Sequence, residues 1–286
     1  MKKIFSLILS LAMLLTITSG LNLTAYADSS QYGNIYYEEK EDGTIEITDC
    51  TSSATSINIP STIDGKTVTS IRNCAFYGCK SLTSVTIPNS ITSIGREAFY
   101  DCTSLTSVTI PDSVTSIGDS AFYNCKSLTN VTIPNSITMI GPDTFCRCSS
   151  LENITIPDSV TSIGDHAFFE WKLVTLTMGN GVNYIDSCAF LNCEQLYEVN
   201  YNATVAQWKA INVDSNNSNL TKAIIKCTDG ILGNGNEVII DNVVYNIYND
   251  YTAQINKYPG NPEILTIPES VSYEGYAFKI NSIGDY

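Results

Sequence analysis

The chain has very little histidine. Its 286 residues contain a single one, His166, at a position of an internal repeat where other copies hold Glu97 and Ser120. Catalysis by histidine needs a nucleophile and an orienting acid that the fold holds in fixed places. A position that varies between repeats is typical of an exposed loop, and we expect His166 to lie in one. Cysteine–histidine and serine–histidine–aspartate mechanisms are therefore not expected, and we predict a protein that is not an enzyme.

Basic residues are also scarce. The chain has 15 Lys and Arg against 29 Asp and Glu, which gives a formal charge of -14 at pH 7. A surface of this charge repels nucleic acid and anionic membranes. We therefore expect no nucleic-acid partner.

Long apolar runs are absent after residue 27, so the mature chain is not expected to insert into a membrane. Before that point, Lys2 and Lys3 precede an apolar run over residues 4–17, and Ala25-Tyr26-Ala27 forms a cleavage pattern. These features predict a signal peptide over residues 1–27. A membrane anchor is the alternative, but the run is short for a bilayer. We expect a secreted, extracellular or cell-surface protein.

Clusters of metal ligands are missing as well. Cys146 and Cys148 form a C-x-C pair, but no second group of cysteine and histidine completes a zinc set. We therefore assign no metal ligand and no cofactor.

A repeat dominates what is present. Phenylalanines recur at intervals of 23, 23, 23, 23 and 22 residues, at Phe76, Phe99, Phe122, Phe145, Phe168 and Phe190. Such spacing is typical of a solenoid, in which each repeat coils once and buries its apolar face against its neighbours. The phenylalanines should occupy the interior of the coils.

One unit covers residues 105–127. Val108 to Ile110 alternates like a half-buried strand, which Pro111 ends because proline has no N–H to donate. A second short strand over 114–117 runs into Gly118, where we expect a positive φ. The Ala-Phe pair that follows would plug the coil from a short helical turn. Leu105, Val108 and Ile110 fit the L-x-x-L-x-L opening of a leucine-rich repeat. We predict a mainly β fold, a leucine-rich-repeat solenoid of parallel β-coils with 23-residue repeats and short helical turns.

The repeat pattern divides the chain. We predict a β-rich N-terminal cap over 28–71, a repeat array over 72–201 and a C-terminal cap over 202–237. Thr204-Val205-Ala206-Gln207 is a capping-box pattern that opens a short helix in the second cap. Residues 238–286 look like the start of a second array, cut off inside a repeat. Ile267-Pro268 repeats Ile59-Pro60 there, and residues 281–284 parallel residues 69–72.

The unit Leu-Thr-Ser-Val-Thr-Ile-Pro-Asp-Ser-Val-Thr-Ser-Ile-Gly-Asp-Ser-Ala-Phe, at residues 105–122, resembles the BspA-type leucine-rich repeat. The resemblance covers roughly residues 32–227 and 243–286. It implies a secreted or surface-attached bacterial protein, and some members of the family bind host extracellular proteins or other microbes. A shared fold does not identify the partner.

Five cysteines share one repeat position: Cys79, Cys102, Cys125, Cys148 and Cys193. Stacked rungs lie about 4.8 Å apart with parallel Cβ vectors, a geometry that disfavours disulfides between neighbours. We expect buried thiols at this position, although export favours oxidation. The best local bridges are Cys74 with Cys79 and Cys188 with Cys193, while Cys50 stands alone.

The outward strand positions carry two rows of small polar side chains. We select as candidate binding residues Thr86, Thr109, Thr132, Thr155, Ser107 and Asn130, together with the aromatic Tyr100 and Tyr123 that follow core phenylalanines. Stacked threonines also stabilise sheets and keep them soluble, which is the structural explanation for the same rows. A flat hydroxyl array could instead bind a protein, a glycan or ice.

We therefore expect a monomeric, non-catalytic adhesion module that binds extracellular host or microbial proteins or glycans. The alternative is the targeting region of an exported enzyme whose catalytic domain lies beyond residue 286. A passive stalk is a third possibility, in which the exposed strand positions would tolerate any charge.

Overall fold

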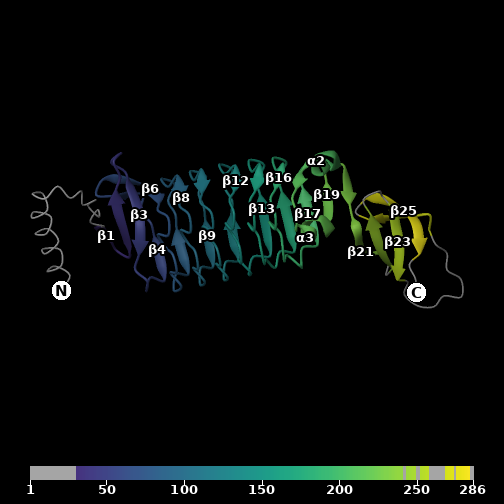
Figure 1. Cartoon of the computed structure of the whole chain (residues 1–286), viewed down its shortest axis with the longest axis horizontal. Coiled ribbons are helices and arrows are strands. Elements are labelled where there is room, and N and C mark those ends of the chain that lie inside the picture. Colours follow the sequence, from purple (N-terminus) through teal and green to yellow (C-terminus); the bar gives the residue numbers. More distant parts are fainter. Residues whose placement is uncertain (1–29, 241–242, 249–251, 258–267, 274, 284–286) are drawn as a thin grey trace, which may run out of the picture.

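The computed structural model describes residues 30–240, 243–248, 252–257, 268–273 and 275–283. The predicted signal peptide lies outside these residues. Among the helices within them, none is long and apolar enough to cross a membrane. The described chain forms one elongated stack of short strands (Figure 1).

The N-terminal end is rich in strands. They are β1 (Ser30–Tyr32), β2 (Ile35–Glu39), β3 (Ile45–Cys50), β4 (Ser56–Asn58), β5 (Thr62–Ile63) and β6 (Lys66–Ile71). β2 pairs antiparallel with both β1 and β3, and β6 pairs in parallel with β3. Alternation buries Ile45 and Ile47 of β3. In β2, Ile35 and Tyr37 pack against the core, and Tyr36 lies between them.

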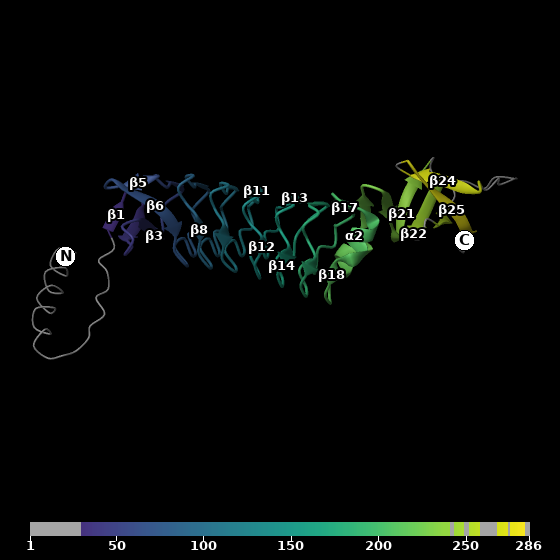
Figure 2. The same cartoon turned by 90° about the horizontal axis from the view of Figure 1, so that it is seen from above.

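The coils build two rows of parallel strands. One row, the threonine face, begins with β4 and continues with β7 (Ser84–Thr86), β9 (Ser107–Thr109), β11 (Asn130–Thr132), β13 (Asn153–Ile156), β15 (Thr175–Met178), β17 (Glu198–Tyr201) and β19 (Ile224–Cys227). The opposite row begins with β6 and continues with β8 (Ser93–Ile94), β10 (Ser116–Ile117), β12 (Met139–Ile140), β14 (Ser162–Ile163), β16 (Tyr184–Ile185) and β18 (Asn212–Val213). Figure 2 shows β11, β13 and β17 along one side and β12, β14 and β18 along the other. The solenoid of parallel coils is confirmed.

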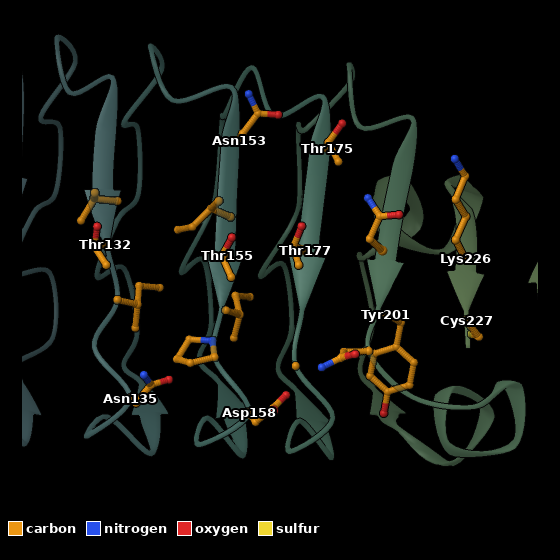
Figure 3. Close-up of a pocket in the computed structure, with 18 of the residues that line it drawn as sticks. Thr132, Asn135, Asn153, Thr155, Asp158, Thr175, Thr177, Tyr201, Lys226 and Cys227 are labelled. Carbon is orange, nitrogen blue, oxygen red and sulfur yellow. The ribbon is translucent and has the colours of Figure 1, made fainter. Parts of the chain in front are cut away.

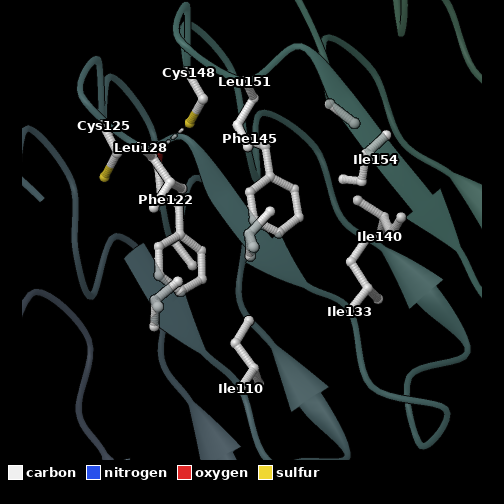
Figure 4. Close-up of a cluster of buried hydrophobic side chains, with 14 of the residues drawn as sticks. Ile110, Phe122, Cys125, Leu128, Ile133, Ile140, Phe145, Cys148, Leu151 and Ile154 are labelled. Carbon is white, nitrogen blue, oxygen red and sulfur yellow. Dashed lines mark hydrogen bonds between the residues drawn. The ribbon is translucent and has the colours of Figure 1, made fainter. Parts of the chain in front are cut away.

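The predicted phenylalanine interior is also confirmed. All six rings are buried, and successive ring centroids lie 4.8, 5.1, 5.4, 6.1 and 5.1 Å apart. Figure 4 shows Phe122 and Phe145 side by side on neighbouring coils, with leucine and isoleucine side chains around them. Each coil therefore contributes one flat ring to a continuous core.

A run of tight turns carries each core ring. Tyr77 N donates to Cys74 O at 3.0 Å within the coil, and Phe76 N donates to Ala98 O of the next coil at 2.8 Å. The residue before each Ala-Phe or Thr-Phe pair has a positive φ of 53–61°, at Cys74, Glu97, Ser120, Asp143, His166 and Cys188. These turns form the third side of the stack, which we call the turn edge.

The positive φ that we expected at Gly118 is wrong. Gly95, Gly118, Gly141 and Gly164 do not have positive φ, and neither does Asp186 at the same repeat position. A Cβ atom on Gly118 would instead lie 2.3 Å from the backbone nitrogen of Arg96 in the preceding coil. Close approach of two backbones requires glycine there, and the positive φ falls two residues later.

The cysteine row consists of buried thiols, with one exception. Four of the thiols donate to the carbonyl of the phenylalanine in the preceding coil, as Cys125 Sγ does to Phe99 O at 3.2 Å. Trp171 replaces cysteine in the short repeat and donates its Nε1 to Phe145 O at 2.6 Å. The row is therefore a set of hydrogen-bond donors as well as a set of small apolar groups.

The local disulfides that the sequence suggested are wrong. Cys79 pairs with Cys50, which was expected to stand alone, while Cys74 and Cys188 are free. Cys79 belongs to the first coil, with no phenylalanine coil before it, and it faces the N-terminal strands instead. Cys74 lies on the turn edge, where its Sγ is 3.6 Å from Glu97 Oε2.

The C-terminal helix forms as predicted. α2 (Val205–Ala210) begins at Thr204, whose hydroxyl accepts from Gln207 N while Gln207 Oε1 accepts from Thr204 N. Val205, Trp208 and Ile211 pack against the core. Parallel pairing nevertheless continues beyond Tyr201, because β19 pairs with β17 and β18 with β16. A second short helix is α3 (Ser218–Lys222), and β20 (Gly230–Leu232) then pairs antiparallel with β19.

The last strands repeat the N-terminal arrangement. They are β21 (Asn234–Ile240), β22 (Val243–Tyr248), β23 (Thr252–Lys257), β24 (Ser270–Tyr273) and β25 (Tyr276–Ile283). β23 pairs in parallel with β25, matching Ile255 with Ile283, as β3 matches Ile47 with Ile71 of β6. β24 pairs antiparallel with β25, as β5 does with β6.

Candidate functional site

The threonine face presents the predicted polar rows in register. Thr86 lies beside Thr109, and Thr109 beside Thr132, in one parallel sheet. Thr155 lies beside Thr177 in the next sheet. Ser107 and Asn130 form the second row, again side by side. All of these candidates except the half-buried Thr177 are exposed.

Some threonines of this face serve the fold itself. Thr106 Oγ1 donates to Thr83 O at 3.1 Å, and Thr129 Oγ1 donates to Thr106 O at 3.2 Å. In the described chain, the hydroxyls of Thr109, Thr132 and Thr155 make no such bond. Sheet stability therefore explains the row that contains Thr106 and Thr129. It does not explain as well the row of Thr109, Thr132 and Thr155, whose hydroxyls are free for a ligand.

Strand pairing is interrupted in the middle of the threonine face. β4, β7, β9 and β11 form one sheet, and β13 begins another. Thr129 N donates to Thr106 O, and Val174 N donates to Glu152 O, but the equivalent amide of Glu152 makes no bond to Thr129 in the described chain. On the opposite row the pairing stops between β10 and β12. The two coils that carry β11 and β13 nevertheless stay paired on the opposite row, where β12 pairs with β14, and their turn edge stays bonded.

An open groove of about 860 Å³ crosses this interruption (Figure 3). Hydroxyl and amide side chains from three strands line it: Asn130, Thr132, Asn153, Thr155, Thr175 and Thr177. A smaller hollow of about 430 Å³ adjoins it at Thr129, Asn130, Ser150, Glu152 and Asn153. The arrangement suits a ligand that exchanges many neutral hydrogen bonds.

The groove includes only part of the predicted set. Asn130, Thr132 and Thr155 line it, whereas Thr86, Thr109 and Ser107 lie on the flat sheet beyond the interruption. Sequence reasoning missed Asn200 and Lys226, which also line the groove. Asn200 could have been found, because it continues the Thr177 position by one repeat. Lys226 could not, because its strand lies in the predicted C-terminal cap.

The lining of the groove includes two charged side chains, Asp158 and Lys226. Lys226 Nζ lies 2.6 Å from Glu198 Oε2 at one end, and this pair is mostly buried. Asp158 Oδ1 accepts from Asn180 N at 2.9 Å near the lower rim. The central lining carries no charged side chain among the described residues. The lining therefore offers many hydrogen-bonding groups and little Coulomb attraction.

Tyr100 and Tyr123 lie on the turn edge, away from the groove. Their rings stack at 4.5 Å, and Tyr77 extends the stack at 4.9 Å from Tyr100. Tyr77 is half exposed but the other two are more buried, and burial raises the pKa of both Tyr100 and Tyr123. The guanidinium of Arg147 lies 6.0 Å from the Tyr123 ring centroid. These rings cover one another's faces, so they offer edges and hydroxyls to a partner.

The repeated coils and the exposed polar groove define a leucine-rich-repeat solenoid. The family model described as "BspA type Leucine rich repeat region (6 copies)" matches residues 48–157 and 115–234. The chain belongs to this BspA-type leucine-rich-repeat family, as its repeat unit indicated.

Two solved structures support the assignment. The leucine-rich repeat protein TpLRR of T. pallidum is 32% identical, with a TM-score of 0.55, over 62% of this chain and 87% of that one. A leucine rich cell surface protein of Faecalibacterium prausnitzii is 27% identical, with a TM-score of 0.50, over 83% of this chain and 63% of that one. No curated protein matches the chain.

Proposed function

We propose that the chain is a non-catalytic binding module of a secreted or cell-surface protein, which holds an extracellular protein or glycan in the groove between β11 and β17. The observation that carries the proposal is the neutral, hydrogen-bonding lining of that groove where strand pairing is interrupted. Free amide and hydroxyl groups match peptide backbones and sugar hydroxyls equally well.

The scaffold favours binding with little reorganisation. The lining side chains stand on strands that are fixed by parallel pairing on one side and by buried phenylalanines below. A ligand would then not have to order a loop before it makes contacts, which lowers the entropic cost of association.

The comparisons support a location outside the cell. One solved neighbour is described as a cell surface protein, and the first 27 residues have the pattern of a signal peptide. The matched family and neighbours are repeat proteins, and none of them is described as an enzyme.

The test measures saturable binding of the full chain to immobilised matrix proteins, mucins, glycans and bacterial surfaces. The variant Thr132→Glu/Thr155→Glu places two carboxylates in the groove and should weaken binding by at least about tenfold, since it leaves buried polar groups of the ligand unpaired. Ser116→Glu/Thr138→Glu is the matched control, because both side chains are exposed on the opposite row of neighbouring coils and neither donates a side-chain hydrogen bond in the described chain.

If both variants bind as tightly as the unsubstituted chain, recognition belongs to another face. No saturable binding to any surface would contradict the proposal and favour the passive stalk.

A further inference from the structure

Three metal-ligating side chains meet on the turn edge, on a different side of the stack from the groove. The carboxylate of Asp165, the imidazole of His166 and the thiol of Cys188 place their ligand atoms within 4.8 Å of one another. We propose that these three residues bind a zinc ion. The site is independent of the proposed binding function.

The repeat brings the residues together. His166 and Cys188 occupy the same repeat position in consecutive coils, and both have a positive φ, 53° and 58°. His166 N donates to Ser187 O at 3.3 Å, which holds the two turns side by side. Their side chains therefore leave neighbouring rungs in the same direction, and Asp165 adds its carboxylate 2.8 Å from His166 Nδ1.

The donor set suits zinc. Thiolate, imidazole and carboxylate are its usual protein ligands, at about 2.3, 2.0–2.1 and 2.0–2.2 Å. Tetrahedral donors at those lengths lie roughly 3.5 Å apart, so the side chains need to close by about an ångström. His166 and Asp165 are 35% and 45% exposed and can rotate to do so. The open surface leaves the fourth position to water.

Other coils lack this combination. The pair at the equivalent positions of the first two coils is Cys74 with Glu97, which supplies a thiol and a carboxylate but no imidazole. Ser120 and Asp143 follow at the same position. The chain's single histidine thus lies in the one described coil whose next neighbour offers a thiol there.

The surroundings favour a cation over an organic substrate. Asp143, on the preceding coil, contributes further negative charge near His166. Neither groove described above includes Asp165, His166 or Cys188. A thiol, an imidazole and a carboxylate on a partly exposed turn edge suit an ion better than an organic substrate, which binds in a concave pocket.

The experiment uses the full chain, freed of metal with a chelator and then titrated with Co²⁺ as a spectroscopic substitute for Zn²⁺. We expect one Co²⁺ per chain, with thiolate-to-cobalt charge-transfer absorption that Zn²⁺ abolishes. His166→Ala and Cys188→Ala should each remove that absorption and weaken Zn²⁺ binding by at least about tenfold.

Cys74→Ala is the matched control, because it removes a free thiol at the same repeat position and should leave the absorption intact. Far-ultraviolet circular dichroism checks folding, and Cys188→Ser offers a second variant of nearly the same size. Zinc should also protect Cys188 from alkylation, as mapped by mass spectrometry. No absorption in the unsubstituted chain, or absorption that survives in Cys188→Ala or His166→Ala, would overturn the proposal.

Discussion

At the scale of single residues, the recurrent glycine is required by the neighbouring coil. A Cβ on Gly118 would lie 2.3 Å from Arg96 N and 2.7 Å from Arg96 Cα, both backbone atoms that cannot move without separating the coils. We expect Gly118→Ala to destabilise the protein by about 2–3 kcal/mol, as overpacking does in cores. Urea unfolding followed by circular dichroism measures the change.

Gly141→Ala is the matched control. Its added Cβ would first meet the Asp119 carboxylate oxygen at 2.6 Å, which is the end of a side chain that can turn away. We expect the free energy of unfolding to fall by less than about 1 kcal/mol. If the two variants lose the same free energy of unfolding, the close-approach explanation is contradicted and backbone conformation is the better reason for glycine.

The buried thiols should make stability fall in alkali. Burial raises the pKa of the Cys193 thiol from 9.0 to about 12. The folded chain therefore keeps a proton between pH 9 and 12 that the unfolded chain releases, so the stabilisation is complete below pH 9 and is lost as the pH rises. Between pH 8 and 10 one such thiol accounts for about 1.4 kcal/mol of lost stability.

Cys193→Ala should remove that share of the pH dependence, measured as urea midpoints at pH 8, 9 and 10. Val199→Ala controls for the cavity, since Val199 is buried in the same region and does not titrate. A parallel pH dependence in Cys193→Ala and the unsubstituted chain would show that Cys193 does not contribute.

At the scale of elements, the capping box decides where α2 begins. Thr204 Oγ1 accepts from Gln207 N at 3.2 Å, which satisfies one of the free amides of the first turn. We expect Thr204→Ala to lower the unfolding free energy by about 1 kcal/mol. Thr221→Ala in α3, an exposed residue with a weaker 3.4 Å bond to Ser218 O, should change it by less than about 0.5 kcal/mol.

A second acceptor stands at the same helix start. Asp229 Oδ1 accepts from Val205 N at 2.7 Å. An unchanged urea midpoint in Thr204→Ala would therefore mean that Asp229 holds the helix start without the capping box.

At the scale of the whole molecule, strand pairing along the threonine face is interrupted between β11 and β13. The amides of Thr129, Glu152 and Val174 occupy one repeat position, and of these three only Glu152 makes no bond to the preceding coil in the described chain. We expect the Glu152 amide to exchange its hydrogen faster than the other two by at least about tenfold. Hydrogen exchange measured by nuclear magnetic resonance tests this, with Thr129 and Val174 as internal controls.

Equal protection at the three amides would show that the sheet is continuous in solution.

Local patterns in the sequence were sufficient for much of this fold. The 23-residue period identified the buried phenylalanines, Pro111 marked the end of a strand, and Thr204 with Gln207 marked the start of a helix. Each depends on residues close in sequence or on a period repeated many times, so neighbours far along the chain were not needed.

The sequence by itself determined the repeat, the inward positions and the family. Only the tertiary structure decided that Cys50 pairs with Cys79, that Gly118 is required by contact with Arg96, and that pairing stops beside Asn130. It also placed His166 beside Cys188, although both stood at one repeat position in the sequence. These outcomes depend on ångström-scale distances between coils, which periodicity leaves open because it fixes which residues stack and not how closely.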